Sequence, residues 1–469
     1  MNVNKLGSSR RAGLVRLVVL VLVSLCAGAP SAVADIGFYD FLSPDFMAGS
    51  ANSVSLESPP ATVLNPAVAA GKQRVTLDLS YIGMWDFSSI VPGGNIVNLG
   101  ITLPTKVGVF STVGRFAQAG FTNLNWGALG GLHLSFAKDL FPELYIGLGL
   151  GFEFGADWGL WGDLGFMHLP GDLGFMKDFR WGMALRGLGK GYYPPTSSTG
   201  VFPDGLAWPP TFTPAVAASF SLIDADPFLL TVSGDLSLPN CMDVRIQLGT
   251  EFSAADIVFL DADVNLDLRQ LIGGDPARSL PLGFGLSLKI KARIPTKVDT
   301  ADATERGWNQ SEMKVTAAAM SMQEGIWAFG MGLNLPIGVV DRTPPSITLD
   351  VEGDKYLAPN FDGVKDDLTL ALGITDQRYV KGFKFMVLDA AGATVTTILN
   401  KEDRPETRDI GNLWKRLVYA KSGIPIPDSI RWDGTSDGGT LVPDGAYTYV
   451  VEAWDDNGNT GASATGTVV

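Results

Sequence analysis

The chain has 469 residues, of which 46% are hydrophobic, and its 49 acidic residues outnumber 35 basic ones to give a formal net charge of −14. An acidic surface repels nucleic acid, so we expect no nucleic-acid partner. The hydrophobic content is not gathered into membrane helices, because after residue 34 no apolar run reaches the roughly 20 residues that a spanning helix needs.

The first 34 residues have the order of an export signal. Basic residues precede an apolar run from Leu17 to Leu25, and the small residues Ala32-Val33-Ala34 follow it. We therefore expect a signal peptide over 1–34 and a mature chain that begins at Asp35. A lipoprotein signal at Cys26 is the alternative, but the bulky residue before that cysteine disfavours processing there.

Removal of the signal leaves 31 basic and 49 acidic residues, a net charge of −18, and Cys241 as the only cysteine. The mature chain therefore cannot form an intramolecular disulfide. A single cysteine of this kind is more often a small apolar filler than a reactive thiol.

Residues 35–73 are rich in small and apolar residues but lack the alternation of a strand. Asn65-Pro66-Ala67 stands within them, and Asn before Pro favours a turn. Two interpretations fit: an ordinary turn before the first strand, or a compact segment whose small residues fit inside a lumen.

From residue 74 to residue 340, apolar residues alternate with small or polar ones in segments of about ten residues. In one segment the small or polar side consists of glycines and Glu153, and the apolar side consists of Ile146, Leu148, Leu150, Phe152 and Phe154. We count about fourteen such strands, which predicts an all-β fold with a transmembrane antiparallel β-barrel. A soluble β-sandwich is the alternative, but the export signal, the strand lengths and the glycine-rich faces favour the barrel.

Two connections between the predicted strands are long. Gly191 to Pro214 is rich in proline and aromatic residues, and Thr296 to Gln310 is charged. Because periplasmic turns of such barrels are short, we expect both connections on the cell exterior.

Eight charged residues fall on the polar side of neighbouring predicted strands. They are Arg245, Glu251, Asp261, Asp263, Asp267, Lys289, Lys291 and Arg293. A basic side chain facing lipid at the bilayer midplane costs about 2–4 kcal/mol, so we place these residues in the lumen. They either pair across the ladder and stabilise the wall, or they line a path that selects solutes.

The composition changes at residues 341–345, Asp-Arg-Thr-Pro-Pro, where consecutive prolines predict a stiff linker. Residues 346–469 then contain shorter strands that suit an immunoglobulin-like β-sandwich. The expected strands are Ser346–Val351, Leu368–Thr375, Phe383–Asp389, Ser429–Trp432 and Tyr447–Trp454. A charged insertion, Lys401 to Asp428, interrupts them.

The segment with Asn65-Pro66-Ala67 resembles the N-terminal region of FadL/PorV-type outer-membrane barrels, and two-part proteins of similar layout occur in spirochaetes. This resemblance implies that residues 35–73 form a hatch, with Asn65, Pro66 and Ala67 as hatch residues. It also implies that the barrel transports apolar solutes such as long-chain fatty acids.

The tail resembles the FlgD-like immunoglobulin-like domain of exported bacterial proteins. Three blocks carry the resemblance in the order of that family: Ala358 to Asp366, Trp432-Asp433-Gly434, and Val442 to Asn459. The fold of such a domain does not fix its function.

No catalytic arrangement stands out in the sequence, and we expect no enzyme. His133 and His168 are the only histidines, and both lie in glycine-rich and aromatic strands. No phosphate-binding loop of the Walker type is present.

One loop of the C-terminal domain spaces oxygen donors as short calcium loops do. Its candidate ligands are Asn360, Asp362, Asp366 and the carbonyl of Val364. An ordinary tight turn is the alternative, because Asn and Asp are common turn residues.

Together these features predict an outer-membrane channel for hydrophobic or amphipathic solutes, surrounded by outer-membrane lipid and gated by a hatch. An outer-membrane anchor or assembly protein is the second interpretation, and an open porin is the third. An even number of strands returns the chain to the side from which it entered, so we expect the C-terminal domain in the periplasm, free to bind a protein partner.

Overall fold

The computed structural model describes residues 39–49, 51–55, 58–87, 91–120, 125–141, 143–193, 207–241, 243–268, 282–291, 311–322, 326–338, 340–341, 343–352, 356–360, 362, 364–376, 379–402, 415–417, 419–456, 458–461 and 464–469. The expected signal peptide, Arg293 and the connection Thr296–Gln310 lie outside these residues. The chain divides into two compact units, residues 1–339 and 340–469. Within the part of the chain that the structure describes, no helix is long and apolar enough to cross a membrane.

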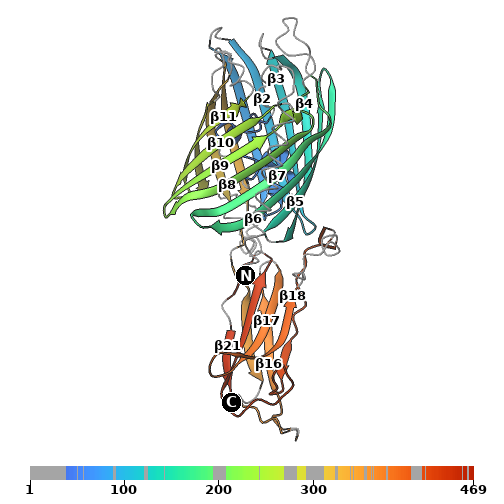
Figure 1. Cartoon of the computed structure of the whole chain (residues 1–469), viewed down its shortest axis with the longest axis vertical. Coiled ribbons are helices and arrows are strands. Elements are labelled where there is room, and N and C mark those ends of the chain that lie inside the picture. Colours follow the sequence, from blue (N-terminus) through green and yellow to red (C-terminus); the bar gives the residue numbers. More distant parts are fainter. Residues whose placement is uncertain are drawn as a thin grey trace, which may run out of the picture. The chain divides into compact units, whose positions relative to one another are not determined.

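Fourteen antiparallel strands of the first unit form a closed barrel, in which each strand pairs with the next and β1 pairs with β14 (Figure 1). The strands are β1 (Val75–Asp86), β2 (Val91–Pro104), β3 (Val109–Gly120), β4 (Asn125–Phe141), β5 (Leu144–Phe154), β6 (Trp158–Leu173), β7 (Met176–Lys190), β8 (Thr213–Ala225), β9 (Phe228–Ser237), β10 (Arg245–Ala254), β11 (Val258–Asp267), β12 (Leu282–Lys291), β13 (Glu312–Ser321) and β14 (Ile326–Ile337). The predicted barrel and its strand number are confirmed.

The alternation in the sequence becomes the two faces of the wall, because successive side chains of a strand point to opposite sides. On β5, Leu148, Leu150 and Phe154 are 57%, 51% and 55% exposed, whereas Glu153 is only 2% exposed. The same division holds on β1, where Leu79 faces outward and Asp78 is buried. The barrel therefore has an apolar exterior, and the inner face of these two strands carries polar and small residues over most of its length.

The described residues among 39–70, here called the inner segment, lie inside the barrel. They contain the short helices α2 (Pro44–Met47) and α3 (Ala61–Leu64) and the 3₁₀ turn η1 (Pro66–Ala69). All of the helical residues are buried. Side chains from strands around the ring contact the segment, including Asn98 of β2, Gln247 of β10 and Thr316 of β13. Only a position in the lumen brings one short segment against strands so far apart in the sheet.

The strand ends that flank the two long connections lie at opposite ends of the barrel. Gly191–Pro214 joins β7 to β8, whereas Thr296–Gln310 joins β12 to β13. Five antiparallel strands separate these connections, and an odd number of crossings changes sides. The prediction that both connections face the cell exterior is therefore wrong. β12 ends and β13 begins at the same end of the barrel where β1 begins and β14 ends.

The second unit contains two sheets around one core. A three-stranded sheet has the order β15-β16-β19, and a four-stranded sheet has the order β18-β17-β20-β21. The strands are β15 (Ser346–Glu352), β16 (Leu368–Thr375), β17 (Val380–Leu388), β18 (Thr394–Glu402), β19 (Ser429–Trp432), β20 (Tyr447–Asp455) and β21 (Ala464–Val468). Leu370 and Trp432 of one sheet share a buried cluster with Phe385 and Val451 of the other. β18 and β21 were not predicted from the sequence, because they contain few apolar residues.

Candidate functional site: the barrel lumen

The Asn65-Pro66-Ala67 motif fixes the inner segment to the wall. The Asn65 Nδ2 amide donates to the carbonyl of Ser53 at 2.9 Å and to the carbonyl of Phe166 on β6 at 3.1 Å. Its Oδ1 accepts from the Ala67 N–H at 3.0 Å, which caps the 3₁₀ turn. One fully buried side chain therefore joins two parts of the segment to the barrel.

Two wall glycines leave room for this motif. A Cβ on Gly147 of β5 would lie 2.3 Å from the Pro66 carbonyl carbon and 2.4 Å from the Ala67 nitrogen. A Cβ on Gly165 of β6 would lie 2.2 Å from the Asn65 Oδ1. The glycine-rich inner face is thus a docking surface for the segment, which explains why these positions carry no side chain.

A buried polar cluster fastens the segment to β7 and β9. Arg186 of β7 donates from Nη2 to the Ser53 hydroxyl oxygen at 2.8 Å and lies 3.6 Å from an Asp235 carboxylate oxygen of β9. The Ser53 hydroxyl donates to that same carboxylate. The guanidinium carbon also lies 4.9 Å from the ring centre of Tyr39, which allows a cation–π contact.

A second charged cluster fastens the segment to β13. Asp45 of α2 accepts a hydrogen bond from the Thr316 hydroxyl at 3.0 Å and forms an ion pair with Lys314 at 3.6 Å. Lys314 forms another ion pair, also at 3.6 Å, with Glu251 of β10. Its ammonium lies 4.7 Å from the ring centre of Phe259. Lys314 therefore forms ion pairs with both the inner segment and the barrel wall.

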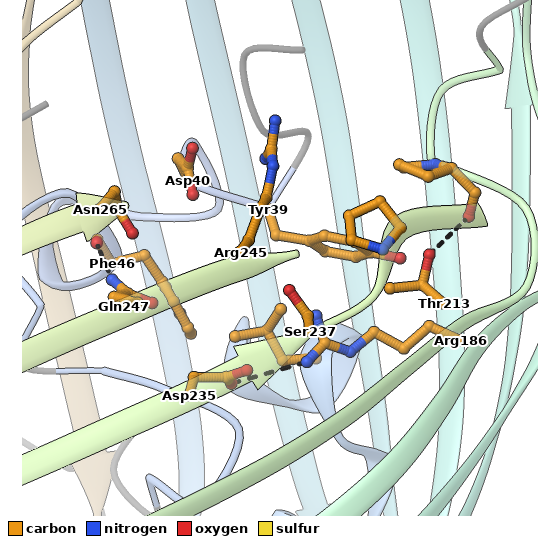
Figure 2. Close-up of a pocket in the computed structure, with 13 residues that line it drawn as sticks. Tyr39, Asp40, Phe46, Arg186, Thr213, Asp235, Ser237, Arg245, Gln247 and Asn265 are labelled. Carbon is orange, nitrogen blue, oxygen red and sulfur yellow. Dashed lines mark hydrogen bonds and ion pairs between the residues drawn. The ribbon is translucent and has the colours of Figure 1, made fainter. Parts of the chain in front are cut away.

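A small cavity lies between the inner segment and strands β7 to β11 (Figure 2). Its lining includes the side chains of Tyr39 and Phe46 from the segment and of Arg186, Asp235 and Arg245 from the wall. The cavity volume is about 50 Å³, which holds a few water molecules at roughly 10–15 Å³ each but no long-chain solute. With the segment in place, this part of the lumen is closed to larger molecules.

The end of the lumen away from the start of β1 is apolar. Six inward-facing side chains there, here called the apolar collar, are at most 4% exposed: Ile82, Met84, Ile96, Met320, Met322 and Ile326. They belong to the same buried cluster as Phe41, Phe46 and Met47 of the inner segment. The lumen is thus apolar toward one end. Elsewhere it carries charged side chains on many strands, among them Arg115 of β3, Glu153 of β5, Arg186 of β7 and Asp235 of β9.

The predicted lumen residues that the structure describes lie on the inner side or at the strand ends. Asp261 and Asp263 are buried, and Arg245 lines the cavity. Lys289 forms ion pairs with Asp256 at 2.9 Å and with Glu312 at 3.9 Å. Asp267 stands opposite Arg245 in the β10–β11 register, and Lys291 stands opposite Glu312.

The sequence reading missed the residues that hold the segment. Lys314, Arg186 and Asp235 each occupy an inward position of an alternating strand, so alternation alone could have placed them in the lumen. Their roles depend on the inner segment, which precedes them by more than a hundred residues. His133 also faces inward, where it contacts Asp163 at 2.8 Å, whereas His168 accepts from the indole N–H of Trp181.

The predicted calcium loop has a local hydrogen-bond network. One Asp362 oxygen accepts from the Asn360 side-chain amide at 2.9 Å, and the other accepts from the Val364 N–H at 2.8 Å. Elsewhere in the second unit, one carboxylate oxygen from each of Asp341, Asp376 and Asp455 lies within 4.8 Å of the others. Calcium at the loop remains a prediction, with Asp366 as a further ligand.

Comparisons with known proteins add similarity of fold only. No protein-family model matches the chain. No curated protein matches it either. The CymD monoaromatic hydrocarbon channel is 11% identical, with a TM-score of 0.42 over 64% of this chain and 98% of that one. A FadL homologue of Pseudomonas aeruginosa is also 11% identical, with a TM-score of 0.35 over 66% and 98%. The KdgM porin in complex with oligogalacturonate is 8% identical, with a TM-score of 0.25 over 55% and 98%.

Proposed function

We propose that this protein is an outer-membrane channel for hydrophobic or amphipathic solutes, such as long-chain fatty acids, and that the inner segment is its hatch. The observation that carries the proposal is a separate N-terminal segment that fills the lumen of a barrel with an apolar exterior. The segment is held by side-chain contacts and is not a strand of the wall. Such contacts can break and re-form without unfolding the barrel.

The two kinds of lumen surface support an amphipathic solute. An apolar chain would pack against the collar that contains Met84 and Met320. A polar group would find donors and acceptors near Arg186, Asp235 and Arg245. Because this cavity has room for only a few water molecules, a long-chain solute that passes along β7 to β11 requires that the inner segment move.

Deletion of Met47 to Ala70 tests the proposal. The deletion should raise conductance in planar bilayers and leak from vesicles, because it removes the material that fills the lumen. The intact protein should bind and take up a fluorescent fatty acid with little ion conductance. Unchanged conductance after deletion, in a barrel that still shows a heat-modifiable gel shift, would contradict the proposal.

A second candidate function is an outer-membrane anchor or assembly protein. The observation that favours it is a second unit with its own buried core, which suits a binding domain. In this alternative the FlgD-like immunoglobulin-like domain lies in the periplasm and binds a protein partner. An anchor would neither conduct ions nor take up fatty acid, and its inner segment would remain fixed.

A further inference from the structure

We propose that Asp163 of β6 is a positioning residue, which holds a β-bulge in β7 and thereby keeps Arg186 directed at the inner segment. This inference rests on the proposed function, because Arg186 is one of the residues that hold the segment in the closed lumen. The route runs from a side chain of one wall strand, through the backbone of the next strand, to the segment.

The pairing of β6 with β7 shifts by one residue at Asp163. The two neighbours of Asp163 on β6 pair with Leu188 and Leu185 of β7. Asp163 alone therefore stands opposite two residues, Arg186 and Gly187. Two residues opposite one make a β-bulge, a feature that often directs a side chain beside a functional site.

The bulge lets two side chains of β7 face opposite sides of the wall. Leu188 is 38% exposed on the outer face, whereas Arg186 is 2% exposed in the lumen. In a regular strand, residues two positions apart share one face. If the register of Leu188 continued without the bulge, Arg186 would stand opposite Leu164, which is 45% exposed on the outer face. The bulge thus keeps the guanidinium in the lumen.

The carboxylate of Asp163 fixes this bulge. Its Oδ1 accepts from the Gly187 N–H at 2.8 Å, and its Oδ2 lies 2.8 Å from the His133 Nε2. The side chains of Asp163 and His133 are only 1% and 5% exposed. A buried backbone N–H that loses its acceptor is costly, so the carboxylate stabilises the bulged form of β7.

The backbone of Gly187 is held on its other side as well. Its φ is +70°, in the left-handed region that favours glycine. Its carbonyl accepts from the Phe212 N–H at 3.0 Å, and a Cβ on it would lie 2.4 Å from the Pro210 carbonyl oxygen. The residue that follows Arg186 is therefore fixed by contacts with both neighbouring strands.

Arg186 carries the effect of the bulge to the inner segment. Its Nη2 donates to the Ser53 hydroxyl at 2.8 Å and lies 3.6 Å from an Asp235 carboxylate oxygen. Hydrogen bonds weaken steeply when their distance or angle changes, so a shift of the β7 backbone weakens this contact. Asp163 also interacts electrostatically with Tyr39 of the segment, which is a second route that the experiment must separate.

Three substitutions test whether the bulge matters. Asp163→Leu removes both oxygens, so the open fraction should rise about tenfold, the factor that about 1.4 kcal/mol produces. Asp163→Asn keeps an oxygen for the Gly187 N–H and should stay close to the wild type. Gly187→Ala disturbs the same bulge from β7 and should raise the open fraction as Asp163→Leu does.

The background Arg186→Met identifies the route. The full chain is reconstituted in vesicles, and two quantities are measured: dye leak, and the labelling rate of a cysteine replacing the buried Ala51 of the segment in a Cys241→Ser background. If Asp163 acts through Arg186, Asp163→Leu adds nothing once Arg186 is Met. Independent effects of about tenfold each would multiply to about a hundredfold, and a direct effect on Tyr39 would persist.

Ser111→Ala is the matched control. It removes a buried wall hydrogen bond of 2.9 Å that joins β3 to Thr102 of β2. The control should leave both leak and labelling unchanged. Heat-modifiable mobility in gels confirms that each barrel is folded, and Gly187→Ala with and without Arg186→Met decides the question if Asp163→Leu does not fold.

The outcomes separate this inference from the proposed function. If Asp163→Leu matches Ser111→Ala, if Asp163→Asn opens the lumen as much as Asp163→Leu, or if the effects multiply in the Arg186→Met background, the positioning role is wrong. The gated channel stands in each of these cases as long as deletion of residues 47–70 opens the lumen. If the deletion leaves the lumen closed, the proposed function fails together with the positioning role.

Discussion

Gly147→Ala should loosen the inner segment by introducing a single methyl group. The new Cβ would lie 2.3 Å from the Pro66 carbonyl carbon, whereas ordinary contacts begin at 3.4 Å, so the motif must move by about 1.1 Å. The wall cannot easily yield, because β5 is paired with β4 and β6 along its length. Overpacking of this kind costs about 1–3 kcal/mol. That cost falls on the closed state, so the open fraction should rise about 5- to 150-fold.

The assay is dye leak from vesicles at matched protein content, with Gly162→Ala as the control. A Cβ on Gly162 of β6 would meet only the Gly149 carbonyl oxygen, at 3.7 Å, which is an ordinary contact. The control should therefore leak no more than the wild type. Equal leak from Gly147→Ala and Gly162→Ala would refute the conclusion that the motif is seated against this glycine.

Three further outcomes concern the second unit. Hydrogen bonds from the Thr397 N–H and the Thr396 hydroxyl hold the pKa of Asp437 below its usual value. The hydrogen bonds stabilise the fold fully above about pH 4, the pKa of an unfolded aspartate, and this stabilisation is lost as the pH falls through the lower pKa of folded Asp437. In the Asp437→Asn variant, the melting midpoint should therefore decrease less as the pH is lowered. Calcium should raise the melting midpoint of the protein relative to chelator, and Asp362→Ala should abolish that shift; a shift that survives the substitution would move the ion away from this loop. A cysteine replacing Ser436 should resist a membrane-impermeant label on intact cells, and labelling there would place the unit outside the cell.

Much of the barrel could be predicted from the sequence, because the alternation of each strand depends only on residues close together in the chain. A strand that faces lipid on one side and a filled lumen on the other must alternate, as β5 does from Ile146 to Phe154. The same alternation placed the glycines of β5 on the inner face before the structure was known. The strand number and the closed antiparallel topology could therefore be predicted before the structure.

The contacts that close the lumen were not predictable in the same way. Lys314 and Asp45 are 269 positions apart, and nothing local to either marks the other as its partner. The side on which each long connection lies depends on the parity of the strands before it, so loop length alone could not show that β7–β8 and β12–β13 are joined at opposite ends of the barrel. β18 was missed because six of its nine residues are polar, and β21 was missed because it has only five residues. Their places in the sheet come from pairing with β17 and β20, respectively.

A reversible lock on the inner segment tests directly whether the segment must move for a solute to pass. The Asp45 Oδ1 and the Thr316 hydroxyl oxygen are 3.0 Å apart, so Asp45→Cys with Thr316→Cys, in a Cys241→Ser background, places two thiols on contacting side chains. Movement of the segment can bring them to the Cβ–Cβ separation of about 3.5–4.5 Å that a disulfide needs. Uptake of a fluorescent fatty acid into vesicles is then measured for the oxidised and the reduced protein. Oxidation should stop uptake, and reduction should restore it. Equal uptake in both states, with the disulfide confirmed by mass spectrometry, would show that solutes do not need this segment to move.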